Sequence, residues 1–293
     1  MILVDANQLM IANVFSIYGK QIDNLELHQV RYAFLRGLTY FQQMFSGEYG
    51  KIVLCYDSTN YWRRSFFPHY KASRKRQQRE SSTDWNRIYQ HFNVIRSEVQ
   101  EELPIASMHM DTLEADDIIA VIAKEHNHRE KILILSSDKD FQQLHSEENI
   151  HQYSPAHKDF IRCENPKEYL LVHTIKGDSS DGIPNIYSDD DAIINGDKKQ
   201  KIVSLKRLNE AIKLIEDEKI DESPLASTYH RNKVLIDFNS IPNDKKDDIL
   251  STFMFAEHDA ARSDFFPSLL SYLRKHSLNR ILEEMDGRSQ LPL

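Results

Sequence analysis

Two aspartates, Asp138 and Asp140, are the first candidates for chemistry, and they follow the short apolar run at residues 132–135 after two serines. An apolar run between polar turns is typical of a strand buried on both faces of a parallel sheet. Open α/β sheets bind ligands at the carboxyl ends of such strands. Two carboxylates held there repel each other unless a cation or a proton lies between them. This stretch therefore predicts a charged site at a sheet edge.

The pattern of an apolar strand followed by an acid occurs twice earlier in the chain. Residues 2–5 end in Asp5, and residues 52–57 end in Asp57. Helical stretches separate the three strands, and this alternation predicts a parallel sheet that places Asp5, Asp57 and Asp138 along one edge. A single aspartate after a strand more commonly caps the next helix. Three together favour a shared site.

Two further acidic groups come later in the sequence. A helix with an apolar face begins near Glu114, and its first turn holds Asp116 and Asp117. Acids in a first turn stabilise the helix dipole, but three in four residues exceed what capping requires. Asp178 and Asp181 lie among turn-forming residues, and this loop would add a second carboxylate pair over the sheet edge.

These clusters offer oxygen ligands, which points to a hard cation such as Mg²⁺ or Mn²⁺. Eight or nine carboxylates are too many for one ion. Two ions roughly 4 Å apart, clamping a phosphodiester during in-line attack, would use them. The 13 histidines show no HExxH or similar spacing, so we expect them on the surface or in the core.

A basic segment at residues 61–79 follows the strand that ends in Asp57. It holds seven Lys or Arg residues and five aromatic residues, with no acid before Glu80, in a chain of net charge −8. Such a segment is a candidate for contacting phosphates and stacking on bases. The alternative is a solvated helix or loop whose aromatic side chains pack inward.

The overall composition is ordinary for a globular protein, with 40% hydrophobic and 28% charged residues. No apolar run approaches the roughly 20 residues of a membrane span, and the first residues lack a basic leader. Cys55 and Cys163 form no CxxC pair, so zinc and a disulfide framework are not expected, and we predict a cytoplasmic protein. Beyond residue 164 the chain reads as helices, with one short strand expected at residues 234–238.

Five motifs in order, ILVDAN, WRRSFFPHYKASR, EADD, SSDKD and GDSSDGIP, resemble the 5′ nuclease family. That family includes flap endonucleases and the 5′ nuclease domain of bacterial DNA polymerase I, and the likeness is greatest to its T-even-type bacteriophage ribonuclease H branch. The resemblance covers most of the chain. It implies an α/β fold with a parallel-type central sheet, flanking helices and a smaller, mostly helical C-terminal domain. We expect a nuclease domain at 1–163, with a basic arch segment at about 61–90, and a DNA-binding domain at 164–293.

The resemblance also implies roles for individual residues. The expected metal ligands are Asp5, Asp57, Glu114, Asp116, Asp138, Asp140 and Asp181, with Asp117 and Asp178 close by. The expected catalytic residues are Lys71, which assists at the scissile phosphate, and Asp116, Asp138 and Asp140. The expected nucleic-acid contacts are Arg63, Tyr70, Lys71 and Arg74, which match the family's arch-region pattern, together with Arg64, Lys75, Arg76 and Arg79 of the same basic segment.

The implied activity is that of a Mg²⁺-dependent 5′→3′ nuclease with two ions, for which Mn²⁺ substitutes. It would remove RNA primers and adjoining DNA from RNA–DNA hybrids and cut branched or 5′-flap DNA. The resemblance suggests a single-stranded-DNA-binding protein or a sliding clamp as partner. A monomer is the default expectation, in a cytoplasm that is the bacterial host's if the protein is phage-encoded. Residues 185–191 lack the family's Gly-rich hairpin, so we expect no monovalent ion site or standard duplex grip there.

Three alternatives remain open. A PIN-like endoribonuclease shares an acidic sheet edge, but the length, the basic segment and the GDSSDGIP motif disfavour it. A haloacid-dehalogenase-type phosphatase would need a second aspartate two residues after Asp5. A branched-DNA-binding protein without catalysis would not need intact acid clusters, because unneeded buried charge destabilises a fold.

Overall fold

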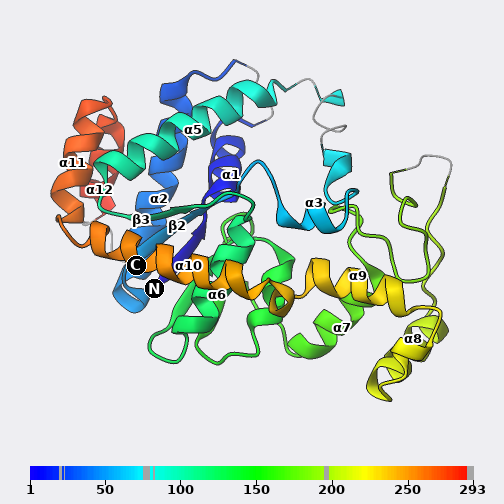
Figure 1. Ribbon diagram of the computed structural model, residues 1–293. Helices are drawn as coiled ribbons and strands as arrows, with labels where there is room; N and C mark the ends of the chain where they lie inside the picture. The colour runs from blue at the N-terminus through cyan, green and yellow to red at the C-terminus, as the bar shows by residue number, and fades with distance from the viewer. Residues whose placement is uncertain (20–21, 23, 75–79, 82, 195–197, 289–293) are drawn as a thin grey trace.

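The computed structural model describes residues 1–293 apart from 20–21, 23, 75–79, 82, 195–197 and 289–293. At its centre lies a six-stranded sheet of order β3-β2-β1-β4-β5-β6 (Figure 1). Every neighbouring pair is parallel except β5 and β6. The strands are β1 (Ile2–Asp5), β2 (Ile52–Tyr56), β3 (Ala106–His109), β4 (Ile132–Leu135), β5 (Ile150–Ser154) and β6 (Asp159–Ile161). The predicted α/β fold is confirmed, and β3, β5 and β6 add to the three strands expected from the sequence.

Helices cover both faces of this sheet, which explains why three successive residues of β1, Ile2, Leu3 and Val4, are apolar. Ile2 and Val4 join one core cluster, and Leu3 joins the other, because successive side chains of a strand point to opposite faces. The first cluster is covered by α1 (Ala6–Tyr18), α2 (Leu27–Tyr49) and α5 (Trp85–Glu102), and the second by α6 (Ala115–His126).

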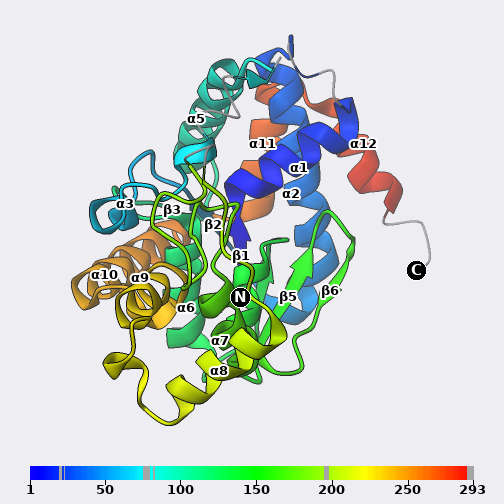
Figure 2. The same cartoon turned by 90° about the vertical axis from the view of Figure 1, so that its right-hand side faces the viewer.

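The C-terminal half is mostly helical, as predicted, and part of it packs on the sheet layers. Figure 1 shows α10 (Asn243–Ala260) beside α6 and β3, and Figure 2 shows α11 (Phe265–Lys275) and α12 (Asn279–Arg288) beside α2. The other helices of this half are α7 (Pro166–Lys176), α8 (Leu205–Glu216) and α9 (Ala226–Ile236), and a short α3 (Trp62–Phe66) lies in the basic segment. A boundary near residue 164, between β6 and α7, stays a prediction. In the described part of the chain, none of the helices combines the length and apolarity that crossing a bilayer requires.

The prediction of a strand at residues 234–238 is wrong. Leu235 and Ile236 end α9, and Asp237 caps a short 3₁₀ helix, Phe238–Ser240, by accepting a hydrogen bond from the Asn239 amide. Both apolar residues are buried against a small cluster that includes Phe67. A short apolar run does not distinguish a strand from a buried helix end, and tertiary packing decided this one.

The sheet has a topological switch point beside β1. The chain runs from β1 to β2 and β3 on one side, then returns to β4 on the other side of β1. Strands that diverge in this way leave a crevice at their carboxyl ends. Asp5 ends β1, and Asp138 follows β4, so the fold places two predicted acids at this crevice.

Candidate functional site

A cleft of about 740 Å³ opens at the carboxyl ends of β1, β2 and β4. Five carboxylates line it, together with four Lys or Arg side chains. The structure therefore brings the three acids that follow strands into one cleft and adds an acid from the first turn of α6. The lining carboxylates are Asp5, Asp57, Asp111, Asp116 and Asp138, and the lining cations are Arg64, Lys71, Arg74 and Arg96.

Backbone hydrogen bonds hold three of these carboxylates in place. Asp5 caps α1, accepting a hydrogen bond from the Gln8 amide at 3.0 Å. Asp57 accepts one from the Ala115 amide at 2.9 Å, where α6 begins. Asp138 caps the 3₁₀ helix Lys139–Leu144. Local capping and a shared site are therefore compatible, because each carboxylate has oxygen lone pairs beyond the one that caps.

The carboxylates in the cleft raise each other's pKa values. Burial, together with the charge of Asp57, raises the pKa of Asp5 to about 7. Burial and the charges of Asp138 and Asp5 raise the pKa of Asp116 well above its ordinary value, and burial also raises that of Asp57. Oxygen ligands crowded to this degree fit a divalent cation, which would neutralise their repulsion.

A second group of acids is already neutralised by cations of the chain. Arg63 is only 2% exposed. Its guanidinium donates to the Leu235 carbonyl at 2.9 Å and pairs with Glu114 at 2.9 Å and Asp117 at 2.8 Å. The prediction that Arg63 contacts nucleic acid is therefore wrong, because its nitrogens point into the protein.

Asp117 belongs to the same buried network and does not line the cleft. It is 0% exposed, accepts a hydrogen bond from the Trp62 indole at 3.1 Å, and completes a capping box with Glu114. We correct its expected metal role: its carboxylate anchors Arg63 and the start of α6. Glu114 likewise forms an ion pair with Lys71 and accepts a hydrogen bond from the Tyr70 hydroxyl, so it holds these two side chains in position.

Lys71 and Tyr70 lie between this network and the cleft. Tyr70 is 3% exposed and its hydroxyl donates to Glu114 at 2.9 Å, so the structure does not present this side chain for the expected nucleic-acid contact. Lys71 lines the cleft, and its Nζ lies 3.4 Å from Asp181. Burial opposes the charge of Lys71, but Tyr70, Glu114 and Asp181 raise its pKa well above the ordinary value. Its φ of 54° is a strained backbone conformation of the kind that clusters at functional sites.

The other predicted nucleic-acid contacts have mixed outcomes. Arg64 and Arg74 line the cleft, where Arg64 lies over the Tyr61 ring and Arg74 pairs with Asp181. Lys75, Arg76 and Arg79 fall outside the described residues. The opposite wall was missed by sequence reasoning, although its spacing on one face of α5 could have indicated it. The residues of α5 that line the cleft are Asn86, Tyr89, Phe92, Asn93 and Arg96.

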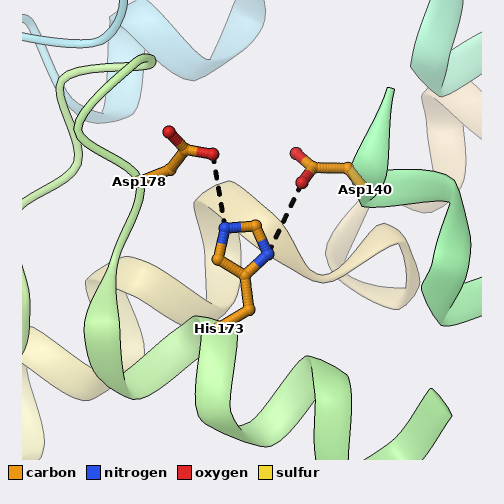
Figure 3. Close-up of side chains that lie close together, drawn as sticks. All are labelled: Asp140, His173 and Asp178. Carbon is orange, nitrogen blue, oxygen red and sulfur yellow. Dashed lines mark hydrogen bonds and ion pairs between the residues drawn. The ribbon is translucent and has the colours of Figure 1, made fainter. Parts of the chain in front are cut away.

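A third group joins Asp140 and Asp178 through a histidine that sequence reasoning did not select (Figure 3). His173 Nδ1 lies 3.4 Å from Asp140, and its Nε2 lies 3.3 Å from Asp178. Burial and the charge of Asp138 raise the pKa of Asp140 to about 7. Burial opposes the charge of Asp178, yet hydrogen bonds from His173, Lys139 and Ser180 hold the pKa of Asp178 well below its usual range.

Known proteins with similar sequences include nucleases of phages and bacteria. Residues 1–170 match the family model of the 5′-3′ exonuclease N-terminal, resolvase-like domain. Ribonuclease H of Enterobacteria phage T4 is 29% identical over 262 residues, which span 86% of this chain and 85% of that protein. A 5′-3′ exonuclease of Buchnera aphidicola subsp. Schizaphis graminum is 31% identical over 146 residues, 46% of this chain and 48% of that one.

Solved structures show the same fold. A T5 5′-exonuclease with zinc bound has a TM-score of 0.61 and 14% identity, covering 88% of this chain and 99% of that chain. A bacteriophage T5 flap endonuclease in a complex with DNA and metal ions also has a TM-score of 0.61 and 14% identity, covering 89% and 99%. Since the family model matches more than half of the residues and the five motifs lie in the family's order, the chain belongs to the 5′-3′ exonuclease family.

Proposed function

We propose that this protein is a Mg²⁺-dependent 5′→3′ exonuclease and 5′-flap endonuclease with ribonuclease H activity. The observation that carries the proposal is the cleft, where carboxylates of mutually raised pKa values face Lys71 and Arg74. Relatives named ribonuclease H, 5′-3′ exonuclease and flap endonuclease support the substrate class.

Two groups of carboxylates would hold two Mg²⁺ ions, with Mn²⁺ as a substitute. Bound ions would activate water for attack on a phosphodiester and neutralise the charge that develops on it. The first group is Asp5, Asp57, Asp116 and Asp138, which line the cleft. The second is Asp140, Asp178 and Asp181, which follow β4 and α7.

The cationic side chains of the cleft would position and stabilise the phosphate. Lys71 is fixed by Glu114 and carries a charge that is available as negative charge develops on the phosphate oxygens. Arg64 and Arg74 would attract the nucleic-acid backbone. Arg96 of α5 would contact the strand from the opposite wall of the cleft.

In the biological role that we propose, the protein removes RNA primers and adjoining DNA during phage-type DNA replication. It would act as a monomer in the bacterial host cytoplasm, on RNA–DNA hybrids and branched or 5′-flap DNA. A single-stranded-DNA-binding protein or a sliding clamp would bring it to the lagging strand. The similarity to T4 ribonuclease H over most of the chain supports this assignment.

Cleavage of a 5′-labelled RNA–DNA primer on a template, beside a 5′-flap duplex, tests the proposal. We expect short 5′-labelled products with Mg²⁺ and none with EDTA. Asp138→Asn should abolish cleavage and leave folding intact, because it alters a carboxylate of the cleft. Asp248→Asn, on the exposed side of α10, is the matched control and should cleave normally. Normal turnover by Asp138→Asn would refute the site. Binding without cleavage under both Mg²⁺ and Mn²⁺ would favour a non-catalytic branched-DNA-binding protein.

A further inference from the structure

The ends of β2 and β3 bring two polar side chains together beneath α5. Tyr56 ends β2, and its partner in the parallel register is His109, which ends β3. Tyr56 belongs to the core cluster that α5 covers, and paired residues of neighbouring strands point to the same face of a sheet. The side chain of His109 therefore lies on the α5 side as well. Both residues line the cleft, together with Arg96 of α5.

The hydroxyl of Tyr56 is buried without a partner. The residue is 1% exposed, and in the described part of the chain its oxygen makes no hydrogen bond. A buried hydroxyl that is left unpaired destabilises the folded state, and an acceptor that reaches it relieves this loss. Because Tyr56 lines the cleft, a molecule bound there is the partner that the fold allows.

Arg96 is a half-buried cation without an acidic partner among the described residues. Lys71 and Arg74, by contrast, are both paired with Asp181. The charge of Arg96 acts on both strand ends. Burial raises the pKa of Tyr56 and lowers that of His109, and the nearby guanidinium lowers both. An anion in this part of the cleft would therefore meet an unpaired positive charge beside an unpaired hydroxyl.

We propose that Tyr56, Arg96 and His109 form a subsite for one phosphate of the substrate strand, other than the phosphate that is cleaved. The inference rests on the proposed function only in taking the ligand to be nucleic acid, and the donors at the ends of β2 and β3 are its new element. A guanidinium, a phenol hydroxyl and a neutral imidazole all offer hydrogen-bond donors, and phosphate oxygens accept such bonds strongly. Asn93, one turn before Arg96 on α5, adds an amide donor to the lining.

The subsite adjoins the carboxylates of the cleft without sharing their ligand atoms. Asp57 directly follows Tyr56 and lines the same cleft. Asp111 also lines it, but this side chain is exposed, so water and salt screen its charge. A strand held both at the metal ions and at Arg96 would be fixed at two phosphates. Its register would then determine which linkage meets the metal ions.

Uncharged linkages test the subsite. In a series of 5′-flap duplexes, a methylphosphonate replaces one phosphate at a time near the junction, and binding is measured in EDTA so that nothing is cleaved. We expect one linkage, other than the scissile one, to weaken binding to the wild type on the order of tenfold. In Arg96→Gln that linkage should matter no more than its neighbours. In Tyr56→Phe its effect should be several-fold smaller than in the wild type.

Two further variants are matched controls. Arg87→Gln removes the same charge from the same helix, at a residue that pairs with Glu26 outside the cleft lining, and it should keep the effect of that linkage. Tyr49→Phe removes a hydroxyl that lies 3.1 Å from His151 Nδ1, so it should lower Tm and leave the linkage effect unchanged. Tyr56→Phe should not lower Tm, because its hydroxyl has no bond to lose.

Two results would overturn the proposal. Equal losses of affinity at every linkage, in the wild type and in Arg96→Gln alike, would show that Arg96 adds only to the general attraction for a polyanion. A fall in Tm for Tyr56→Phe as large as that for Tyr49→Phe, with the linkage effect unchanged, would give the hydroxyl a structural role. Flap cleavage with Mg²⁺, measured on the same preparations, separates this inference from the proposed function. Cleavage without a linkage-specific effect refutes the subsite alone, and linkage-specific binding without cleavage refutes the nuclease alone.

Discussion

At the scale of single residues, neighbouring acids of α6 have opposite electrostatic roles. Burial opposes the charge of Glu114, but Lys71 and Arg63 lower its pKa, so its charge is permanent and paired. Asp116, two residues later, faces other carboxylates, which together with burial raise its pKa well above the ordinary value. Glu114 therefore holds basic side chains in place, whereas Asp116 is available to bind a cation.

The buried partner of Glu114 provides the first prediction. Arg63→Met should lower the free energy of unfolding by about 3–5 kcal/mol, because it leaves Glu114 and Asp117 buried without a counter-charge. Urea unfolding measures the loss. The control is Arg64→Met, a partly exposed neighbour whose contacts are a carbonyl and the face of Tyr61, and it should cost about 1 kcal/mol or less. Equal losses for the two variants would contradict the assignment of Arg63 as a structural residue.

At the scale of elements, the loop after α7 connects the metal candidates with the basic segment. Its Asp181 carbonyl accepts a hydrogen bond from the Lys71 amide at 2.7 Å. Gly182, at φ 75°, lies so close to this segment that a Cβ would come within 2.8 Å of the His69 carbonyl. The position of Lys71 in the cleft therefore depends on a loop more than 100 residues away in the sequence.

Gly177→Ala tests this loop. Positive φ costs an L-residue roughly 1–2 kcal/mol, and a Cβ at this position would also meet the Ile183 carbonyl at 2.4 Å. We expect a larger loss of unfolding free energy than in Gly50→Ala, where φ is 82° and a Cβ meets nothing within 4 Å. The additional loss should be about 1–3 kcal/mol, with weaker Mn²⁺ binding through displacement of Asp178. Indistinguishable urea midpoints for the two variants would count against a tightly fitted turn.

At the scale of the whole molecule, the net charge of −8 does not reveal that the charged residues near the cleft form two separate groups. Three cations in and behind the cleft, Arg63, Lys71 and Arg74, are bound to Glu114, Asp117 and Asp181. Their ion pairs are therefore made with a different set of acids from the carboxylates Asp5, Asp57, Asp116 and Asp138. Folding therefore brings like charges together at the crevice. The repulsion between these carboxylates destabilises the folded state, and a ligand that binds only the folded state at this site can offset that loss.

This division of charge predicts how stability depends on pH without metal. The pKa values of Asp5 and Asp140 are about 7 in the folded protein, above the ordinary 3.8, so the folded state binds more protons between these values. Their contribution to stability is present at low pH and is lost as pH rises from about 4 through 7. Without metal, the Tm of Asp5→Asn minus the Tm of the wild type should therefore increase as pH rises from 5.5 to 8.

Added Mg²⁺ gives the converse measurement. It should raise the Tm of the wild type more at pH 8 than at pH 5.5, because deprotonated carboxylates bind the ion better. A Tm difference between Asp5→Asn and the wild type that does not change with pH would show that Asp5 titrates at its ordinary value. Mg²⁺ stabilisation that is equal at the two pH values would point to ligands outside the cleft.

The sequence by itself determined the elements that are locally encoded. The three strands before Asp5, Asp57 and Asp138 are continuous apolar runs, because both faces of the sheet are covered. The start of α6 at Glu114 follows from its capping residues. The gathering of acids at one sheet edge followed from parallel strand order alone.

Only the tertiary structure decided which charged residues are available for binding. Arg63 and Arg64 are adjacent in a basic segment, yet one is enclosed by Glu114 and Asp117 and the other lines the cleft. His173 lay outside every sequence motif, and a glycine turn placed it between two carboxylates. The physical reason is that charge pairing and burial depend on partners far apart in the chain, which local patterns of residue type do not specify.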